Sequence, residues 1–464
     1  MSDDAETIPL GPEPAADAPA VDAPAADASV PEGLIAPAEP ASEDARPAGM
    51  AAFADTVRAD PALFEHAPVE PPFARHVLTS PLHMNVAMES RTNLWTHWNG
   101  YTAADILTNI EDEYRALRHA AAISDISPLV KYRISGREAL AYLTRLVADN
   151  PAGLSVDDAA PVVFCEDRGF VVGDGLLFRL GEEEYRLVTE ETHLGWLLDS
   201  AIGFAVQVDD VSSTLAGLSL QGPLSARILA LAGFADIETL RPYAARWFQV
   251  AAMPVYVSRT GSSGDLGYEL WVDPEDAQPV WAHLLTHGAP LGLAAGGFAL
   301  RELARIEAGI ARAGRDYLGA FSAVDDDSAS TPYELGLAAL VDLDHGHFTG
   351  RDALRAAKAA PPRHILATLA IDWREPLNFT GIHAGGLVAG IATSTAFSPS
   401  LETNLALAML KPSALAKGAM LHIEAEVRRG FELRRLKVPA RIVAGPVLSL
   451  PARHLVPAPA GPKP

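Results

Sequence analysis

The segment Pro161–Val188 reads PVVFCEDRGFVVGDGLLFRLGEEEYRLV. It contains three β-prone runs separated by two turn clusters, Glu166–Gly169 and Gly181–Glu184. Apolar runs of this length, bounded by Gly and charged residues, predict a meander of three antiparallel strands. We expect the remainder of the fold to be built around this meander.

One residue breaks the apolar pattern of the second run. Asp174 stands in its middle, between Gly173 and Gly175. Asp is disfavoured inside strands, and a buried carboxylate is costly unless another group pairs with it. Flanking glycines allow a ligand or another backbone to approach closely. Asp174 is therefore either a strand-bend residue bound to backbone or solvent, or a carboxylate at the floor of a binding cavity.

The charge of the chain is strongly acidic and unevenly distributed. The formal net charge is −23, of which residues 1–48 contribute −10 through eleven acidic residues and Arg46. Neither this stretch nor the remainder is basic, which argues against nucleic acid as a partner.

A single cysteine, Cys165, excludes a disulfide framework and a thiolate metal cluster. No metal site is expected. The sequence has no apolar run of membrane-spanning length and no basic region followed by an apolar core at its N-terminus. These features predict a soluble, cytoplasmic protein without a membrane partner.

Composition and periodicity divide the 464 residues into parts. The first is Ala/Pro-rich, acidic and without aromatic residues, so it cannot offset its ordering entropy by burial. Mixed helical and strand patterns follow, and after residue 361 strand follows strand. The predicted parts are a disordered tail (1–48), an extended wrapping segment (49–94), a two-subdomain α+β body (95–360), a β-barrel (361–450) and a frayed tail (451–464).

Three further patterns contain candidate functional residues. The aromatic cluster Trp95–Tyr101 can hold a methylated cation or an aromatic substrate, or it can seal the edge of a core. Glu269 is a second acid inside an apolar strand, after a glycine-rich loop. Arg301 and Arg305 lie four residues apart on a predicted helix, so both can face one anion or pair with neighbouring glutamates.

Several short motifs occur in a fixed order along the chain: Glu113–Arg118, Asp125–Tyr132, Gly169–Asp174, Gln221–Pro223, Ser258–Glu269, Arg305–Gly309, Thr331–Leu337 and Thr395–Leu401. In order and spacing they resemble the motifs of the folate-dependent aminomethyltransferase family. This family comprises the T protein of the glycine-cleavage system and its demethylase relatives. The resemblance extends from about Trp95 to about Val447.

The resemblance implies a ring-like, three-domain α+β fold with a central cavity for tetrahydrofolate and a C-terminal β-barrel. It implies that the protein is an enzyme that transfers one-carbon groups. Asp174 would be the catalytic carboxylate near the reacting nitrogen of the pterin, and Glu269 would bind the amino-pyrimidine edge. The implied cofactor-binding residues are Glu269, Arg305, Tyr268 and Gly173. Candidate substrate residues are Trp98, Tyr101, Tyr132, Tyr243, Arg301 and Arg315.

Some positions depart from the family pattern. Pro128 and Leu129 stand where the family has His and Met, and Ser262 and Ser263 stand where it has Tyr and Thr. Gly173 replaces the first acid of the common meander motif. These departures concern the donor more than the fold. A small methylated donor is therefore one hypothesis, and an aminomethyl group on a lipoyl carrier protein is the other.

Two hypotheses from other classes remain. A non-catalytic folate-binding protein, like the iron–sulfur maturation relatives, would carry a Lys-Gly-Cys-Tyr-type motif after the arginine helix, and this sequence has none there. A purely structural protein would have no need of Asp174 and Glu269.

Overall fold

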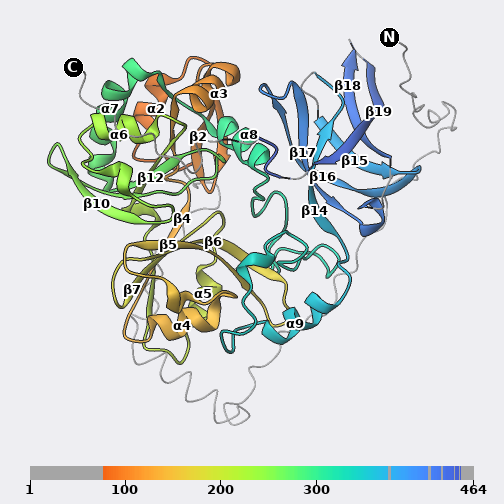
Figure 1. Cartoon of the computed structure of the whole chain (residues 1–464), viewed down its shortest axis with the longest axis horizontal. Coiled ribbons are helices and arrows are strands. Elements are labelled where there is room, and N and C mark those ends of the chain that lie inside the picture. Colours follow the sequence, from red (N-terminus) through yellow and green to blue (C-terminus); the bar gives the residue numbers. More distant parts are fainter. Residues whose placement is uncertain are drawn as a thin grey trace, which may run out of the picture. The chain divides into compact units, whose positions relative to one another are not determined.

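The computed structural model describes residues 77–374, 378–415, 420–429, 432–443, 445–448 and 450. The predicted tails at 1–48 and 451–464 lie outside these described residues, as do residues 49–76 of the predicted wrapping segment. The described strands form a two-stranded hairpin, two larger sheets and a closed barrel (Figure 1).

The predicted meander is present and forms one side of a five-stranded sheet with the order β5-β6-β7-β4-β8. Its neighbouring strands are paired antiparallel throughout. Helices α4 and α5 contribute to the same apolar core, which contains Tyr142, Phe164 and Leu197. The bounds are β4 (Val130–Ser135), β5 (Asp158–Cys165), β6 (Val171–Arg179), β7 (Glu184–Thr189), β8 (Gln207–Asp210), α4 (Ala139–Leu146) and α5 (Leu194–Ser200).

A six-stranded sheet has the order β10-β11-β12-β9-β3-β13, and only its β13–β3 pair is parallel. Its core includes Trp281 and Leu284 of α7 and Ile228 and Leu229 of α6. The bounds are β3 (Ala121–Asp125), β9 (Ala216–Gln221), β10 (Ala245–Val250), β11 (Met253–Ser258), β12 (Gly267–Val272), β13 (Leu293–Ala295), α6 (Ser225–Leu231) and α7 (Pro274–Gly288).

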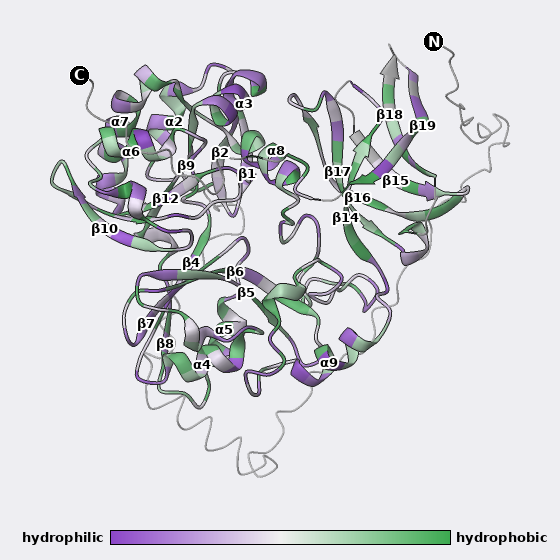
Figure 2. Ribbon diagram, in the orientation of Figure 1, coloured by the Kyte–Doolittle hydropathy of each residue, from purple (hydrophilic) through white to green (hydrophobic). Residues whose placement is uncertain are grey.

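The C-terminal strands close into a barrel with the order β14-β17-β16-β15-β18-β19. Strand β14 is almost entirely apolar and hydrophobic in colour, whereas helix α9 (Arg351–Ala359) before it mixes hydrophilic and hydrophobic residues (Figure 2). The bounds are β14 (Ile365–Ile371), β15 (Asn378–Ala384), β16 (Leu387–Ser398), β17 (Thr403–Leu410), β18 (Leu421–Arg429) and β19 (Glu432–Val443). The α+β class with a C-terminal β-barrel is thus confirmed.

Helices α3 (Ile110–His119) and α8 (Phe298–Ala308) are joined at their starts by a buried carboxylate. Glu113 accepts hydrogen bonds from the backbone N–H groups of Leu107, Thr108 and Gly297, at 2.7, 3.0 and 2.9 Å. Helix α8 ends at Gly309, whose φ of +71° favours glycine. These contacts fix the helix that carries Arg301 and Arg305.

The structure differs from the sequence-based expectation before residue 94. Residues 83–89 of the expected extended segment form helix α2 (His83–Glu89), and the hairpin β1 (Leu94–Trp98) and β2 (Tyr101–Ile106) follows. Val86 is buried in the core that also contains residues of α7, and this burial outweighs the weak helical pattern of the sequence. No helix in the described ranges combines the length and apolarity needed to cross a bilayer.

Candidate active site

Five of the predicted site residues line one cavity of about 220 Å³. They come from β6, β12, α8 and the loop before β10, and they are Asp174, Tyr243, Glu269, Arg301 and Arg305. Together with Glu190 and Arg312, which also line it, three carboxylates and three arginines meet at this one cavity.

Asp174 is half-buried on β6 and points into this cavity. The hydroxyl of Tyr317 donates a hydrogen bond to its Oδ1. Burial raises the pKa of Asp174, and the Tyr317 hydrogen bond opposes the rise. No ion pair joins Asp174 to an Arg, Lys or His in the part of the chain that the structure describes. Its negative charge is therefore not compensated by a neighbouring side chain.

The two glycines beside Asp174 have packing roles. A Cβ at Gly173 would lie 2.5 Å from Nε2 of His193, and a Cβ at Gly175 would lie 2.3 Å from the carbonyl oxygen of Val188. Gly175 lines the cavity, but Gly173 does not. The close approach of the His193 ring gives Gly173 a packing role, and its contact with a cofactor stays a prediction.

Glu269 is half-buried on β12 and accepts a hydrogen bond from the Thr260 hydroxyl at 2.6 Å. Burial raises the pKa of Glu269. Because side chains alternate along a strand, the adjacent Tyr268 points to the opposite face and lies in the core, fully buried. Burial raises the pKa of Tyr268 to about 12. Tyr268 does not line the cavity, so its predicted contact with a cofactor is not supported by its position.

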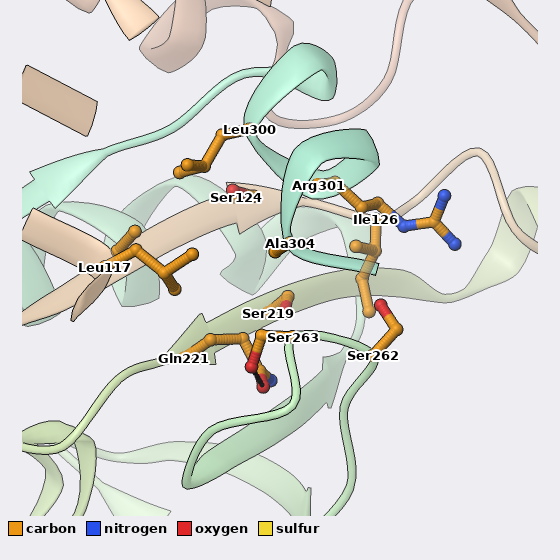
Figure 3. Close-up of a pocket in the computed structure, with 11 residues that line it drawn as sticks. Leu117, Ser124, Ile126, Ser219, Gln221, Ser262, Ser263, Leu300, Arg301 and Ala304 are labelled. Atoms are coloured by element: carbon orange, nitrogen blue, oxygen red, sulfur yellow. Dashed lines mark hydrogen bonds between the residues drawn. The ribbon is translucent and has the colours of Figure 1, made fainter. Parts of the chain in front are cut away.

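The loop before β12 closes the cavity next to Glu269. Gly261 approaches Gln221 so closely that a Cβ would lie 2.1 Å from its Oε1. Ser263 donates a hydrogen bond to the same oxygen at 2.9 Å, and Figure 3 shows this pair beside Ser219 and Ser262. Ser219, Ser262, Ile126 and Arg301 line both this small adjoining pocket and the main cavity.

Arg305 is almost fully buried, and its guanidinium is saturated with acceptors. It donates to Glu302 at 2.8 and 2.7 Å, to Asp316 at 2.7 Å, to the Ile310 carbonyl at 3.1 Å and to Ser394 at 2.8 Å. These bonds make Arg305 a link between α8, the following loop and barrel strand β16.

Arg301 differs from Arg305 in having unused hydrogen-bonding capacity. It pairs with Glu190, and its guanidinium carbon lies 4.7 Å from the centre of the Trp98 ring. Its Nη1 is buried without a hydrogen-bond acceptor among the described residues. Burial lowers the pKa of Arg301 to about 10. Such a group is suited to bind an anion that enters the cavity.

The other substrate candidates lie apart from the cavity. Trp98 is 4% exposed and packs on Phe298 with 5.1 Å between ring centres. Tyr132 is fully buried, and its hydroxyl accepts the His193 N–H at 2.6 Å. Tyr101 is half-buried on β2. Arg315 is exposed and lines a different space of about 770 Å³ next to β16.

Sequence reasoning missed three residues of the site. Tyr317 contacts Asp174, Thr260 contacts Glu269, and Glu190 pairs with Arg301. Thr260 lies inside the quoted loop motif Ser258–Glu269, and Tyr317 directly follows Asp316. Neither Thr260 nor Tyr317 stands in a sequence pattern that identifies its partner, because both contacts depend on the folded structure.

Comparison with known proteins agrees with this architecture. Residues 81–345 match the family described as GCVT N-terminal domain, and residues 366–448 match the glycine cleavage T-protein C-terminal barrel domain. The aminomethyltransferase of Streptomyces avermitilis is 33% identical over 344 residues, covering 72% of this chain and 88% of that protein. The aminomethyltransferase of Saccharopolyspora erythraea is 30% identical over 374 residues, covering 79% and 97%.

A solved structure gives the same result for the fold. The glycine cleavage system aminomethyltransferase T from Bartonella henselae superposes with a TM-score of 0.70 at 21% identity, covering 82% of this chain and 99% of that one. The order of motifs, the family matches and the shared fold lead to one conclusion. The chain belongs to the glycine-cleavage T-protein family of aminomethyltransferases, enzymes that transfer one-carbon groups.

Proposed function

We propose that this protein transfers a methyl or aminomethyl group from a small methylated donor to tetrahydrofolate. The observation that carries the proposal is the pair of half-buried carboxylates, Asp174 and Glu269, that face one cavity. Neither forms an ion pair within the described residues, so the site is complementary to nitrogen-bearing groups that carry or develop positive charge.

The residues of the cavity fit a pterin. Oε1 of Glu269 has no hydrogen-bond partner among the described residues, so the carboxylate can accept the adjacent N–H donors of an amino-pyrimidine ring. Arg301 has a buried Nη1 that lies 4.0 Å from Glu302 Oε1 but has no hydrogen-bond acceptor among the described residues, and a carboxylate of the folate or of the donor would supply one. Tetrahydrofolate, when bound, would supply the nitrogen that accepts the one-carbon unit.

Asp174 then has the catalytic role. Its carboxylate would orient the reacting nitrogen and stabilise positive charge that develops there during transfer. A carboxylate without a cationic partner is suited to this task, since no side chain competes for its charge. Tyr243, at the wall of the same cavity, is a candidate for contact with the donor.

The second candidate function is aminomethyl transfer from a lipoyl carrier protein. It is favoured by the relatives, which are named aminomethyltransferases, and by the structural neighbour, which is a glycine-cleavage enzyme. The replaced positions Pro128, Leu129, Ser262 and Ser263 favour the small donor instead. In either form we propose that the enzyme acts in the cytoplasm.

A single-turnover assay with purified full-length protein and tetrahydrofolate tests the proposal. One arm offers aminomethyl-lipoyl carrier protein, and the other offers methoxy-aromatic, methylated amine and sulfonium compounds. Formation of 5-methyl-tetrahydrofolate from a small compound would support the first proposal, and 5,10-methylene-tetrahydrofolate from the carrier would support the second. Tetrahydrofolate binding without product in either arm would favour a non-catalytic folate-binding protein.

A further inference from the structure

Tyr317 is the one side chain among the described residues that donates a hydrogen bond to the Asp174 carboxylate. It is 4% exposed and lies in a loop between α8 and α9, far from Asp174 in the sequence. Its hydroxyl occupies Oδ1 and leaves Oδ2 without a second side-chain partner. The position of the carboxylate therefore depends on the position of Tyr317.

The loop holds Tyr317 in place from both sides. On one side, Asp316 is 2% exposed and accepts hydrogen bonds from Arg305 at 2.7 Å and from Thr393 and Ser394 of β16 at 2.6 Å each. On the other side, the backbone N–H of Ala320 donates to the Val171 carbonyl at 2.7 Å. The chain on either side of Tyr317 is thus anchored to α8, to the barrel and to the start of the strand that carries Asp174.

The charged surroundings of the pair are mostly acidic. Glu191 interacts unfavourably with both Asp174 and Tyr317, and Arg312 partly offsets the charge of Glu191. The neighbouring His193 is neutral, since burial lowers its pKa to about 4, and burial raises the pKa of Cys165, which stays a thiol. The other ionisable groups that line the cavity are Glu190, Tyr243, Glu269, Arg301 and Arg305. None of these groups forms an ion pair with Asp174 in the described structure.

We propose that Tyr317 is a positioning residue, which holds Oδ1 of Asp174 so that Oδ2 faces the reacting nitrogen. This inference rests on the proposed function, because the reacting nitrogen belongs to that proposal. The physical reason is general. A hydroxyl that donates to a carboxylate stabilises the charged form, and here it opposes the effect of burial. Tyr317 itself stays protonated, because burial and the nearby Asp174 raise its pKa well above the ordinary value.

Nuclear magnetic resonance of the full-length protein labelled at the aspartate carboxyl carbons tests the inference without a donor. Asp174→Asn identifies the Asp174 resonance by its loss. In Tyr317→Phe the titration midpoint of this resonance should move to higher pH. The matched control is Tyr333→Phe, because Tyr333 packs against the same hydrophobic cluster and its buried hydroxyl has no partner among the described residues.

The second readout is the dissociation constant of tetrahydrofolate. Tyr317→Phe should change it less than about threefold, whereas a general disruption of the cavity would weaken binding as strongly as Glu269→Gln does. An unchanged titration midpoint in Tyr317→Phe, or an equal shift in Tyr333→Phe, would overturn the inference. Absence of tetrahydrofolate binding in the wild-type protein would instead overturn the proposed function, and the titration would still test the Tyr317 contact.

Discussion

The two charged walls of the cavity are built in opposite ways. On the arginine wall, Arg305 has acceptors for its donors from Glu302, Asp316, Ser394 and the Ile310 carbonyl. On the carboxylate wall, Asp174 and Glu269 each have one hydroxyl partner and no ion pair among the described residues. The charge of Arg305 is satisfied by the protein, whereas the charges of Asp174 and Glu269 are not.

This difference separates stability from binding. Buried charges that are fully paired within the protein stabilise the fold only together. If one partner is removed, the remaining charges are left buried and unpaired. A buried charge that the protein leaves unsatisfied costs stability and is available for a ligand. Substitution of Arg305 should therefore change the stability of the protein, whereas substitution of Asp174 or Glu269 should change ligand binding or activity.

The largest effect is expected from Arg305→Met. The variant leaves the buried Asp316 without its cation and removes one of the arginines that pair with Glu302. It should lower the free energy of unfolding by about 3–5 kcal/mol. Urea denaturation measures this change. The control is Arg315→Met, because Arg315 is exposed and should change stability by less than about 0.5 kcal/mol. Equal effects of the two variants would show that the arginine wall has no special structural role.

Asp174→Asn should lower activity rather than stability. Loss of the carboxylate should slow single-turnover transfer to tetrahydrofolate roughly 10²–10³-fold without lowering the thermal unfolding temperature. Asp167→Asn, in the exposed turn before β6, is the matched control and should keep the wild-type rate. Wild-type turnover in Asp174→Asn would remove Asp174 from the reaction.

Glu269→Gln should weaken the binding of tetrahydrofolate roughly tenfold. The amide keeps the volume of the side chain but removes its charge and replaces one acceptor with a donor. Equilibrium binding, with Glu275→Gln on the exposed start of α7 as control, measures the effect. Identical affinity in both variants would place the pterin elsewhere.

The smallest effect concerns the pH dependence of stability. Burial raises the pKa of Asp174 and Glu269 above their unfolded values of 3.8 and 4.5. Between the unfolded and folded pKa values, the native state binds more protons than the unfolded chain, so the unfolding free energy falls as pH rises through this window. The double variant Asp174→Asn, Glu269→Gln does not undergo this pH-dependent fall in the unfolding free energy. At pH 7 it should therefore be roughly 1 kcal/mol more stable than the wild type.

At pH values below both unfolded pKa values the two carboxyls are neutral in every state, so the advantage of the double variant should disappear. Thermal unfolding at pH 7 and near pH 3 compares the two conditions. A double variant that is less stable than the wild type at pH 7 would show that the carboxylate wall contributes to the fold, as the arginine wall does.

The strand meander and the two acids inside apolar strands were visible in the sequence because they depend on local patterns. Strand alternation also explains why Glu269 reaches the cavity while the adjacent Tyr268, also predicted to bind the cofactor, lies in the core on the opposite face. The glycines around Asp174 gave no such guidance, because a glycine in the sequence does not indicate which group packs against it. The reason for Gly173 is a histidine twenty residues away.

Contacts between distant segments could not be predicted in this way. Trp98 looked like a cavity wall in the sequence but packs against Phe298 of α8, and Arg305 looked like an anion-binding residue but is saturated by protein acceptors. The contact between Tyr317 and Asp174 spans 143 positions. Only the packing of α8, the barrel and the meander brings such residues together.

The bonds of Asp316 have a consequence for the design of chimaeric enzymes. Asp316 lies before the barrel in sequence, but its partners Thr393 and Ser394 belong to barrel strand β16. An exchange of barrels between relatives at the natural junction would therefore separate a buried carboxylate from the hydroxyl groups that bind it. Designs that transfer Asp316, Thr393 and Ser394 as one unit keep the neighbouring Tyr317 in register with Asp174.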